Sequence, residues 1–166
     1  MTAIASRDGI LVAAVGRSGT TDRELVAISV TGEEIWRRPF QSDLYVDRMA
    51  VSAAGVWLAE RNGDGSVGRI RHLDAGGVEI WSSDTDSGPI GFSMDPQSRI
   101  IAFAGSTGPN STGAYMALTQ YDANSGEVLS RDLLRIHNLP TSIAVAAQDD
   151  IWENSGGTLY EYKREP

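Results

Sequence analysis

The sequence contains no cysteine and only two histidines among its 166 residues. The lack of cysteine excludes disulfide bonds, cysteine nucleophiles and zinc–thiolate sites. The histidines, His72 and His137, stand far apart, and neither has a second histidine nearby in the sequence. A histidine metal triad and a Ser–His–Asp constellation are therefore unsupported, and we expect neither a bound metal nor a cofactor.

Long apolar runs and a surplus of positive charge are also missing. The run Ile10–Val15 has six residues, too short for a membrane span or for the apolar part of a signal peptide. We therefore expect no membrane span and, for the chain as written, no signal peptide. The location stays open: either the protein stays in the cytoplasm or this chain is part of a longer protein. The net charge of −8 repels phosphate backbones, so nucleic acid is not an expected partner.

What the sequence does contain is a repeat. Residues 8–40 read as a short apolar run, a polar Gly-rich loop, a second apolar run and a glycine turn that leads to Glu-Ile-Trp. The same order returns at 55–81, at 99–130 and, truncated, at 150–163. The glycines before the closing strands, Gly32, Gly77 and Gly126, are 45 and 49 residues apart. This period is typical of the ~40–50 residues of a four-stranded β-propeller blade.

The repeat predicts a single all-β domain that consists of about four four-stranded, propeller-type blades. The blades cover approximately residues 1–40, 41–82, 83–134 and 135–166. Because each blade packs between two neighbours, its middle strands are expected to be apolar on both faces. Trp36 and Trp81, on the closing strands, are expected to pack between adjacent sheets. Trp57 and Trp152 are expected to occupy equivalent positions.

Several motifs resemble those of known propeller repeats. Residues 9–60 and the third copy, with its turn at 121–126, resemble the bacterial β-propeller repeats of the SBBP and delta-60 type. Residues 55–70 are similar to the blades of streptogramin lyase-like and NHL propellers, and residues 150–152 share part of that pattern. The resemblance covers nearly the whole chain. It implies a propeller fold and no particular activity.

The fourth copy differs from the other three because the sequence ends before its outer strand. Three arrangements are open: a fragment of a larger propeller, a small ring of about four blades, or a ring that two copies complete together. We favour an incomplete or oligomeric ring over a closed monomer.

The predicted ligand-binding face carries the loops between the second and third strands and the crossings between blades, including 41–47 and 83–89. Acidic residues gather in these segments. The candidate ligand-binding residues are Asp43, Asp47, Asp64, Asp84, Asp86 and His137. Residues 84–88 begin like a calcium loop, but Pro89 follows where that loop would continue its turn, so solvated carboxylates are the better interpretation.

These observations favour a binding or scaffolding module for a protein, a small molecule or a carbohydrate. The alternative is a propeller enzyme of the lyase or lactonase type that uses loop-face carboxylates. The resemblance to lyase blades implies a possible general-base role for His137, but no catalytic residue is assigned. A propeller that holds a redox cofactor has the least support.

Overall fold

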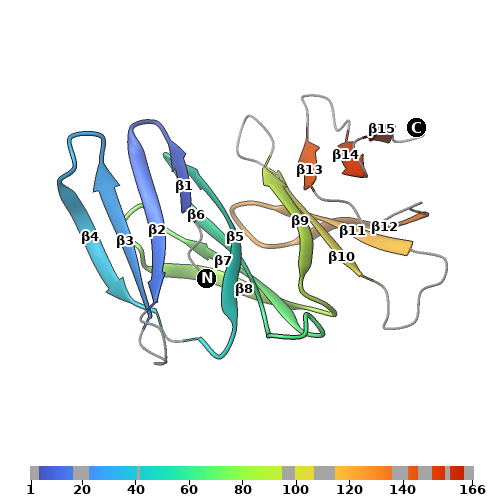
Figure 1. Cartoon of the computed structure of the whole chain (residues 1–166), viewed down its shortest axis with the longest axis horizontal. Coiled ribbons are helices and arrows are strands. Elements are labelled where there is room, and N and C mark those ends of the chain that lie inside the picture. Colours follow the sequence, from blue (N-terminus) through green and yellow to red (C-terminus); the bar gives the residue numbers. More distant parts are fainter. Residues whose placement is uncertain are drawn as a thin grey trace. The chain divides into compact units, whose positions relative to one another are not determined.

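All the regular secondary structure of the described residues in the computed structural model is antiparallel β-strand (Figure 1). The structure describes the backbone of residues 4–16, 23–40, 42–94, 100–106, 115–135, 142–145, 151–155 and 158–162, and most side chains of 5–16, 23–40, 42–88, 92–94 and 117–133. The chain divides into two compact units, Met1–Thr85 and Asp86–Pro166. We describe each unit separately.

The first unit contains two four-stranded sheets in which consecutive strands pair. Sheet 1 consists of β1 (Ile4–Arg7), β2 (Ile10–Gly16), β3 (Arg23–Ser29) and β4 (Glu34–Pro39). Sheet 2 consists of β5 (Tyr45–Ser52), β6 (Gly55–Arg61), β7 (Gly68–Leu73) and β8 (Glu79–Thr85). Turn-forming residues stand between consecutive strands, such as Gly9 between β1 and β2 and Gly32 between β3 and β4.

The core of the first unit lies between the two sheets. β2 and β3 contribute Val12, Ala14, Leu25 and Ala27, and sheet 2 contributes Val46, Val51, Val56, Leu58 and Leu73. The opposite face of sheet 2 is also buried, with Trp57, Ala59 and Ile70 at 0% exposure. Sheet 2 therefore buries both faces, as the sequence predicted for the middle strands of a blade.

A hydrogen-bonded turn with a glycine near its end follows the third strand of sheets 1, 2 and 3. In sheet 1, the Gly32 amide donates to the Ser29 carbonyl and the Ser29 amide donates to Glu33. In sheet 2, the Gly77 amide donates to the Asp74 carbonyl at the same spacing. In sheet 3, the Gly126 amide donates to the Asp122 carbonyl and the Asp122 amide donates to Glu127, so that turn is one residue longer. All three glycines have positive φ angles, between 74° and 85°, which a glycine adopts at little cost. The repeated glycines of the sequence therefore mark the same turn in sheets 1 and 2 and a turn that is one residue longer in sheet 3.

The outer strand of sheet 1 contacts this turn of sheet 2. The Trp36 indole Nε1 donates a 2.7 Å hydrogen bond to the Ala75 carbonyl, and Arg38 Nε donates to the Gly76 carbonyl at 3.2 Å. Trp36 also packs against the core between the sheets. The prediction that Trp36 packs between adjacent sheets is thus confirmed. For convenience we call residues 74–78 the covered turn and residues 29–33 the open turn.

Two glycine substitutions should reveal the difference between these turns. A Cβ atom at Gly77 would stand 3.0 Å from the Trp36 ring, whereas a Cβ at Gly32 would meet no described atom within 4 Å. Gly32→Ala should cost about 1–2 kcal/mol because of its positive φ alone. Gly77→Ala should cost more, since it bears the same strain and also displaces Trp36. Urea unfolding of both variants measures the difference, and equal losses would contradict the role given to Trp36.

The second unit contains the remaining two sheets. Sheet 3 consists of β9 (Pro89–Met94), β10 (Ile100–Ser106), β11 (Tyr115–Asp122) and β12 (Val128–Arg135). Sheet 4 consists, within the described residues, of β13 (Ser142–Val145), β14 (Ile151–Ser155) and β15 (Thr158–Tyr162). Trp152 pairs with Ala144 on β13, as Trp57 pairs with Ala50 on β5, so the two tryptophans hold equivalent positions in their sheets.

The fold class predicted from the repeat is confirmed: the chain is all-β, with three four-stranded sheets and a fourth of three described strands. Two predicted crossings are corrected. Residues 83–85 continue β8, and residues 45–47 begin β5. In each case the backbone remains paired with its neighbouring strand, which keeps the buried backbone groups hydrogen bonded. No helix that could cross a membrane occurs in the part of the chain that the structure describes.

Candidate functional site

The predicted acidic residues of the first unit lie toward one end of sheet 2. Tyr45 pairs with Arg61, Arg61 with Gly68, and Gly68 with Thr85, so the start of β5 and the end of β8 share this end with the loop at 62–67. Asp43 is exposed just before β5, and Asp64 lies in the loop. Asp47 and Asp84 lie on strands β5 and β8 rather than in crossings.

Arginines pair with most of these carboxylates. Asp47 accepts from Arg61 at 3.1 Å and also pairs with Arg48 at 3.2 Å, and its side chain is only 6% exposed. Asp84 pairs with Arg69 at 2.7 Å. In the second unit, the exposed Asp86 pairs with Arg131 at 2.5 Å. These contacts neutralise charge that a cation or a basic ligand would otherwise use.

Asp64 has a local structural role. Its Oδ1 accepts a 2.9 Å hydrogen bond from the Ser66 amide, and this interaction lowers the pKa of Asp64 below its ordinary value. Among the described residues, no three histidine, cysteine, aspartate or glutamate side chains gather closely enough to hold a metal ion. The candidate residue His137 lies outside the described residues.

A buried ion pair near the same end was not anticipated from the sequence. Glu60 on β6 has a side chain at 0% exposure, and its Oε1 accepts from Arg71 Nε at 2.8 Å. Ser42 donates a 2.7 Å hydrogen bond to the other carboxylate oxygen, and Arg71 also pairs with Glu79. The sequence feature that could have indicated this pair is a glutamate at the end of an otherwise apolar run, residues 55–60. Arg71 and Ser42 therefore satisfy both oxygens of the buried Glu60 carboxylate within sheet 2 and the segment before it.

His72 is buried in an aromatic stack. Its ring lies parallel to Trp57 with the centroids 4.2 Å apart, and Trp81 approaches edge-on at 5.9 Å. Only 2% of His72 is exposed, and neither ring nitrogen has a hydrogen-bond partner among the described residues. Burial lowers the pKa of His72 below its ordinary value of 6.5, and this effect outweighs the nearby Ala54 backbone and Asp74 carboxylate, which favour the charged form.

The buried His72 should make stability depend on pH. Below pH 6.5 the unfolded chain binds a proton at this histidine, while the folded chain resists protonation. The free energy of unfolding should therefore fall as the pH drops from 6.5 towards the lowered pKa of the folded state. Urea unfolding at pH 7.5 and pH 5.5 measures this loss. His72→Phe, which keeps a ring against Trp57, should reduce it, and an unchanged pH dependence in that variant would refute the assignment.

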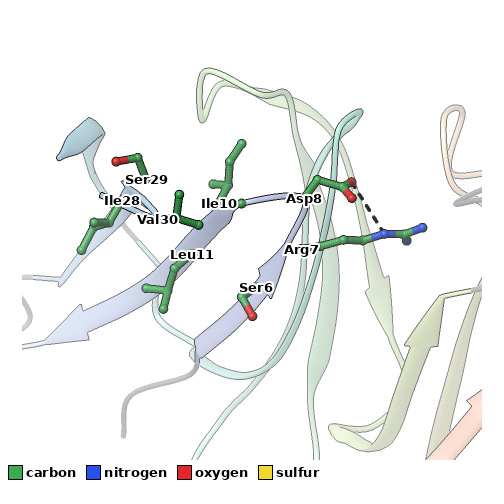
Figure 2. A pocket seen from close by; sticks show the side chains of 9 residues that line it. Ser6, Arg7, Asp8, Ile10, Leu11, Ile28, Ser29 and Val30 are labelled. Atoms are coloured by element: carbon green, nitrogen blue, oxygen red, sulfur yellow. Dashed lines mark ion pairs between the residues drawn. The ribbon is translucent and has the colours of Figure 1, made fainter. Parts of the chain in front are cut away.

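A pocket of about 510 Å³ lies at the turn end of sheet 1. Figure 2 shows it surrounded by the hairpin turn between β1 and β2 and by the end of β3. Ser6, Leu11 and Ile28 form one cross-strand row of the lining, and their side chains point to the same side of the sheet. At the rim, Arg7 and Asp8 form an ion pair at 3.8 Å. Sequence reasoning missed this pocket because it depends on what covers the sheet.

The open turn borders the pocket. Its residue Val30 is 82% exposed, and both Ser29 and Val30 line the pocket. The Val30 amide donates to the Gly9 carbonyl at 3.0 Å, which ties the open turn to the hairpin turn beside it. Val30 is one of several exposed apolar side chains among the described residues, and it is the pocket beside it that makes this surface a candidate binding site.

Comparisons with known proteins identify the fold. No family model matches the sequence, and no curated protein matches it. Several solved structures match the fold of the chain. Hydrazine synthase from Kuenenia stuttgartiensis matches with a TM-score of 0.64 at 10% identity, over 99% of this chain and 58% of that one. The β-propeller domain of the Trilobed protease from Pyrococcus furiosus, which has an open velcro topology, matches with a TM-score of 0.59 at 12% identity, over 98% and 56%. A functionally unknown protein from Desulfotomaculum acetoxidans DSM 771 matches with a TM-score of 0.59 at 17% identity, over 98% and 55%.

The sheets and these similarities together define a protein of the β-propeller type. The identities, from 10 to 17%, support the fold and not a function. The chain spans little more than half the length of the three chains that it matches. The finer resemblance to SBBP, delta-60 or streptogramin lyase-like repeats has no support from a family model.

Proposed function

We propose that the protein is a binding module that recognises a protein partner through the open turn and the pocket beside it. The observation that carries the proposal is the contrast between two equivalent turns of the first unit. The covered turn of sheet 2 holds Trp36 and Arg38, whereas the open turn of sheet 1 exposes Val30 next to a pocket of about 510 Å³.

The loop-face acids favour this module over an enzyme. Asp47, Asp84 and Asp86 are paired with arginines, and Asp64 stabilises its own loop. General acid–base catalysis needs a group that is positioned to exchange a proton with substrate, and carboxylates held in such pairs are poorly suited to that role. No observation on the described residues favours the lyase or lactonase alternative.

Titration with small apolar probes, observed by NMR, tests the proposal. Indole and N-acetyl-leucinamide should shift the amide signals of residues 6–11 and 28–32 more than any other group. Val30→Arg should weaken these shifts, whereas Val67→Arg, at the opposite end of sheet 2, should leave them unchanged. Shifts that gather elsewhere, or no shifts, would refute the assignment of this surface.

A further inference from the structure

We infer that Asn62, in the loop between β6 and β7, is a site of chemical modification. The Gly63 backbone nitrogen displaces the side-chain amide of Asn62, and hydrogen bonds within the loop set the rate of this deamidation. Of the five asparagines in the sequence, Asn62 is the one that a glycine follows. The inference is independent of the proposed binding function, since residues 62–67 belong neither to the open turn nor to the pocket beside it.

The reaction needs only the chain itself and water. The Gly63 nitrogen attacks Asn62 Cγ and loses its proton, the bond from Cγ to Nδ2 breaks, and Nδ2 leaves with that proton as ammonia. The product is a five-membered succinimide ring. Water then opens the ring at one of its two carbonyls and gives either aspartate or isoaspartate, in which the main chain continues through the side chain. No oxidant or reductant takes part.

Gly63 is an accessible nucleophile. The residue is exposed, and a Cβ atom placed on it would meet no described atom within 4 Å. Among the described residues, none accepts a hydrogen bond from the Gly63 amide. Because glycine has no side chain and a freely turning backbone, its nitrogen can approach the preceding Cγ without a steric barrier. The attacking group is therefore both open to solvent and free to move.

Asn124 shows the opposite arrangement at a comparable turn. Asn124 is also exposed, and the small residue Ser125 follows it. However, the Ser125 amide donates a 2.8 Å hydrogen bond to the Asp122 carboxylate. This bond occupies the nitrogen that would have to attack, and it holds that nitrogen in the turn. Exposure alone does not distinguish the two sites, so the state of the following amide decides, and we expect Asn124 to persist.

Hydrogen bonds of the Asn62 side chain slow the reaction in the folded loop. Its Oδ1 accepts from the Val67 amide at 3.2 Å, and its Nδ2 donates to the Ser66 hydroxyl at 2.9 Å. Both bonds direct the side chain across the loop, whereas ring closure needs Cγ turned towards the Gly63 nitrogen. Deamidation therefore proceeds from molecules in which the loop has opened locally. Loss of one such bond should raise the open population about fivefold.

Isoaspartate would change the loop that Asn62 begins. In the present loop the Asn62 amide donates to the Val67 carbonyl at 3.1 Å, and the Asn62 carbonyl accepts from the Gly65 amide at 3.3 Å. Isoaspartate adds one carbon to the main chain between these two groups, so the two bonds cannot both keep their geometry. The new carboxylate also adds a negative charge close to Asp64. The modified loop should therefore exchange its amide hydrogens faster than the native one.

The test incubates the folded, isotope-labelled full chain at mildly alkaline pH and follows it by NMR. The Nδ2 signals of Asn62 should disappear before those of any other asparagine. Digestion at low pH and mass spectrometry should then locate isoaspartate at residue 62. Gly63→Ala should slow the loss severalfold, because its methyl group hinders the attacking nitrogen. Ser66→Ala should speed the loss about fivefold, and Ser82→Ala, at an exposed serine outside the loop, should not change it.

Three results would overturn the inference. Loss of Asn124 or another asparagine before Asn62 would refute the site, and loss of Asn62 without isoaspartate would refute the ring, since isoaspartate forms only through it. An unchanged rate in Ser66→Ala would show that the hydrogen bonds of the loop do not set the rate. The comparison of Asn62 with Asn124 uses the unaltered chain, so it holds even if a variant fails to fold.

Discussion

Replacing Trp57 with alanine is expected to lower the free energy of unfolding by about 3–5 kcal/mol, the range for a fully buried tryptophan. Trp57 is 0% exposed on β6, a middle strand, and its ring stacks on His72. The substitution removes apolar contacts from a buried face of sheet 2 and leaves a cavity that the paired strands on both sides cannot close.

Urea unfolding followed by circular dichroism measures this loss, and Trp81→Ala is the matched control. Trp81 also contacts His72, but it lies on the outer strand β8 and is half-buried. Its removal should cost clearly less than that of Trp57. If the two variants lost equal stability, the described burial of the outer strand would be wrong.

Replacing Arg71 with methionine is expected to cost about 3–5 kcal/mol because it leaves a buried carboxylate without its cation. Glu60 is fully buried, and after the substitution only the Ser42 hydroxyl would satisfy it among the contacts described. Arg71 also pairs with Glu79 at 2.5 Å and lies 5.1 Å from the centre of the Phe40 ring. The loss therefore includes packing as well as charge.

The double variant Glu60→Gln, Arg71→Met isolates the effect of the unpaired charge. The glutamine is neutral and can still accept the hydrogen bond from Ser42, so the double variant should be more stable than Arg71→Met alone. This non-additivity is expected because the two side chains are in direct contact. If the loss of stability in the double variant equalled the sum of the losses in Glu60→Gln and Arg71→Met alone, Glu60 would not depend on Arg71 for its burial.

The repeat predicted the fold well because its landmarks are local. Gly32, Gly77 and Gly126 mark turns whose backbone needs a positive φ, and the apolar runs between turns give the strands. A blade is a meander of neighbouring strands, so short-range patterns specify most of its pairing. Trp36 was interpreted correctly for the same reason, since its place on the closing strand follows from the period.

The candidate site was predicted less well because it depends on cross-strand register. Asp84 and Arg69 are fifteen residues apart in the sequence yet pair on neighbouring strands. Glu60 and Arg71 likewise form an ion pair across two neighbouring strands, β6 and β7. From the composition alone these acids are available negative charges. The pairing of the strands, however, brings an arginine to Asp84 and to Glu60.

The open turn was beyond the reach of sequence patterns for a different reason. Residues 29–33 and 74–78 form the same turn, and nothing in their own residues shows that Trp36 covers one of them. Whether a repeated surface is covered depends on the neighbouring blade. A repeat protein can therefore present the same backbone feature once as an internal contact and once as a surface for a partner.

The central claim is that the open turn is exposed in solution while its equivalent is covered. A soluble paramagnetic agent tests this claim directly by NMR, because it broadens amide signals according to their exposure. The Gly32 amide should broaden strongly, and the Gly77 amide and the Trp36 indole N–H should broaden weakly. Equal broadening of Gly32 and Gly77 would contradict the account, since the open turn would then be covered as well.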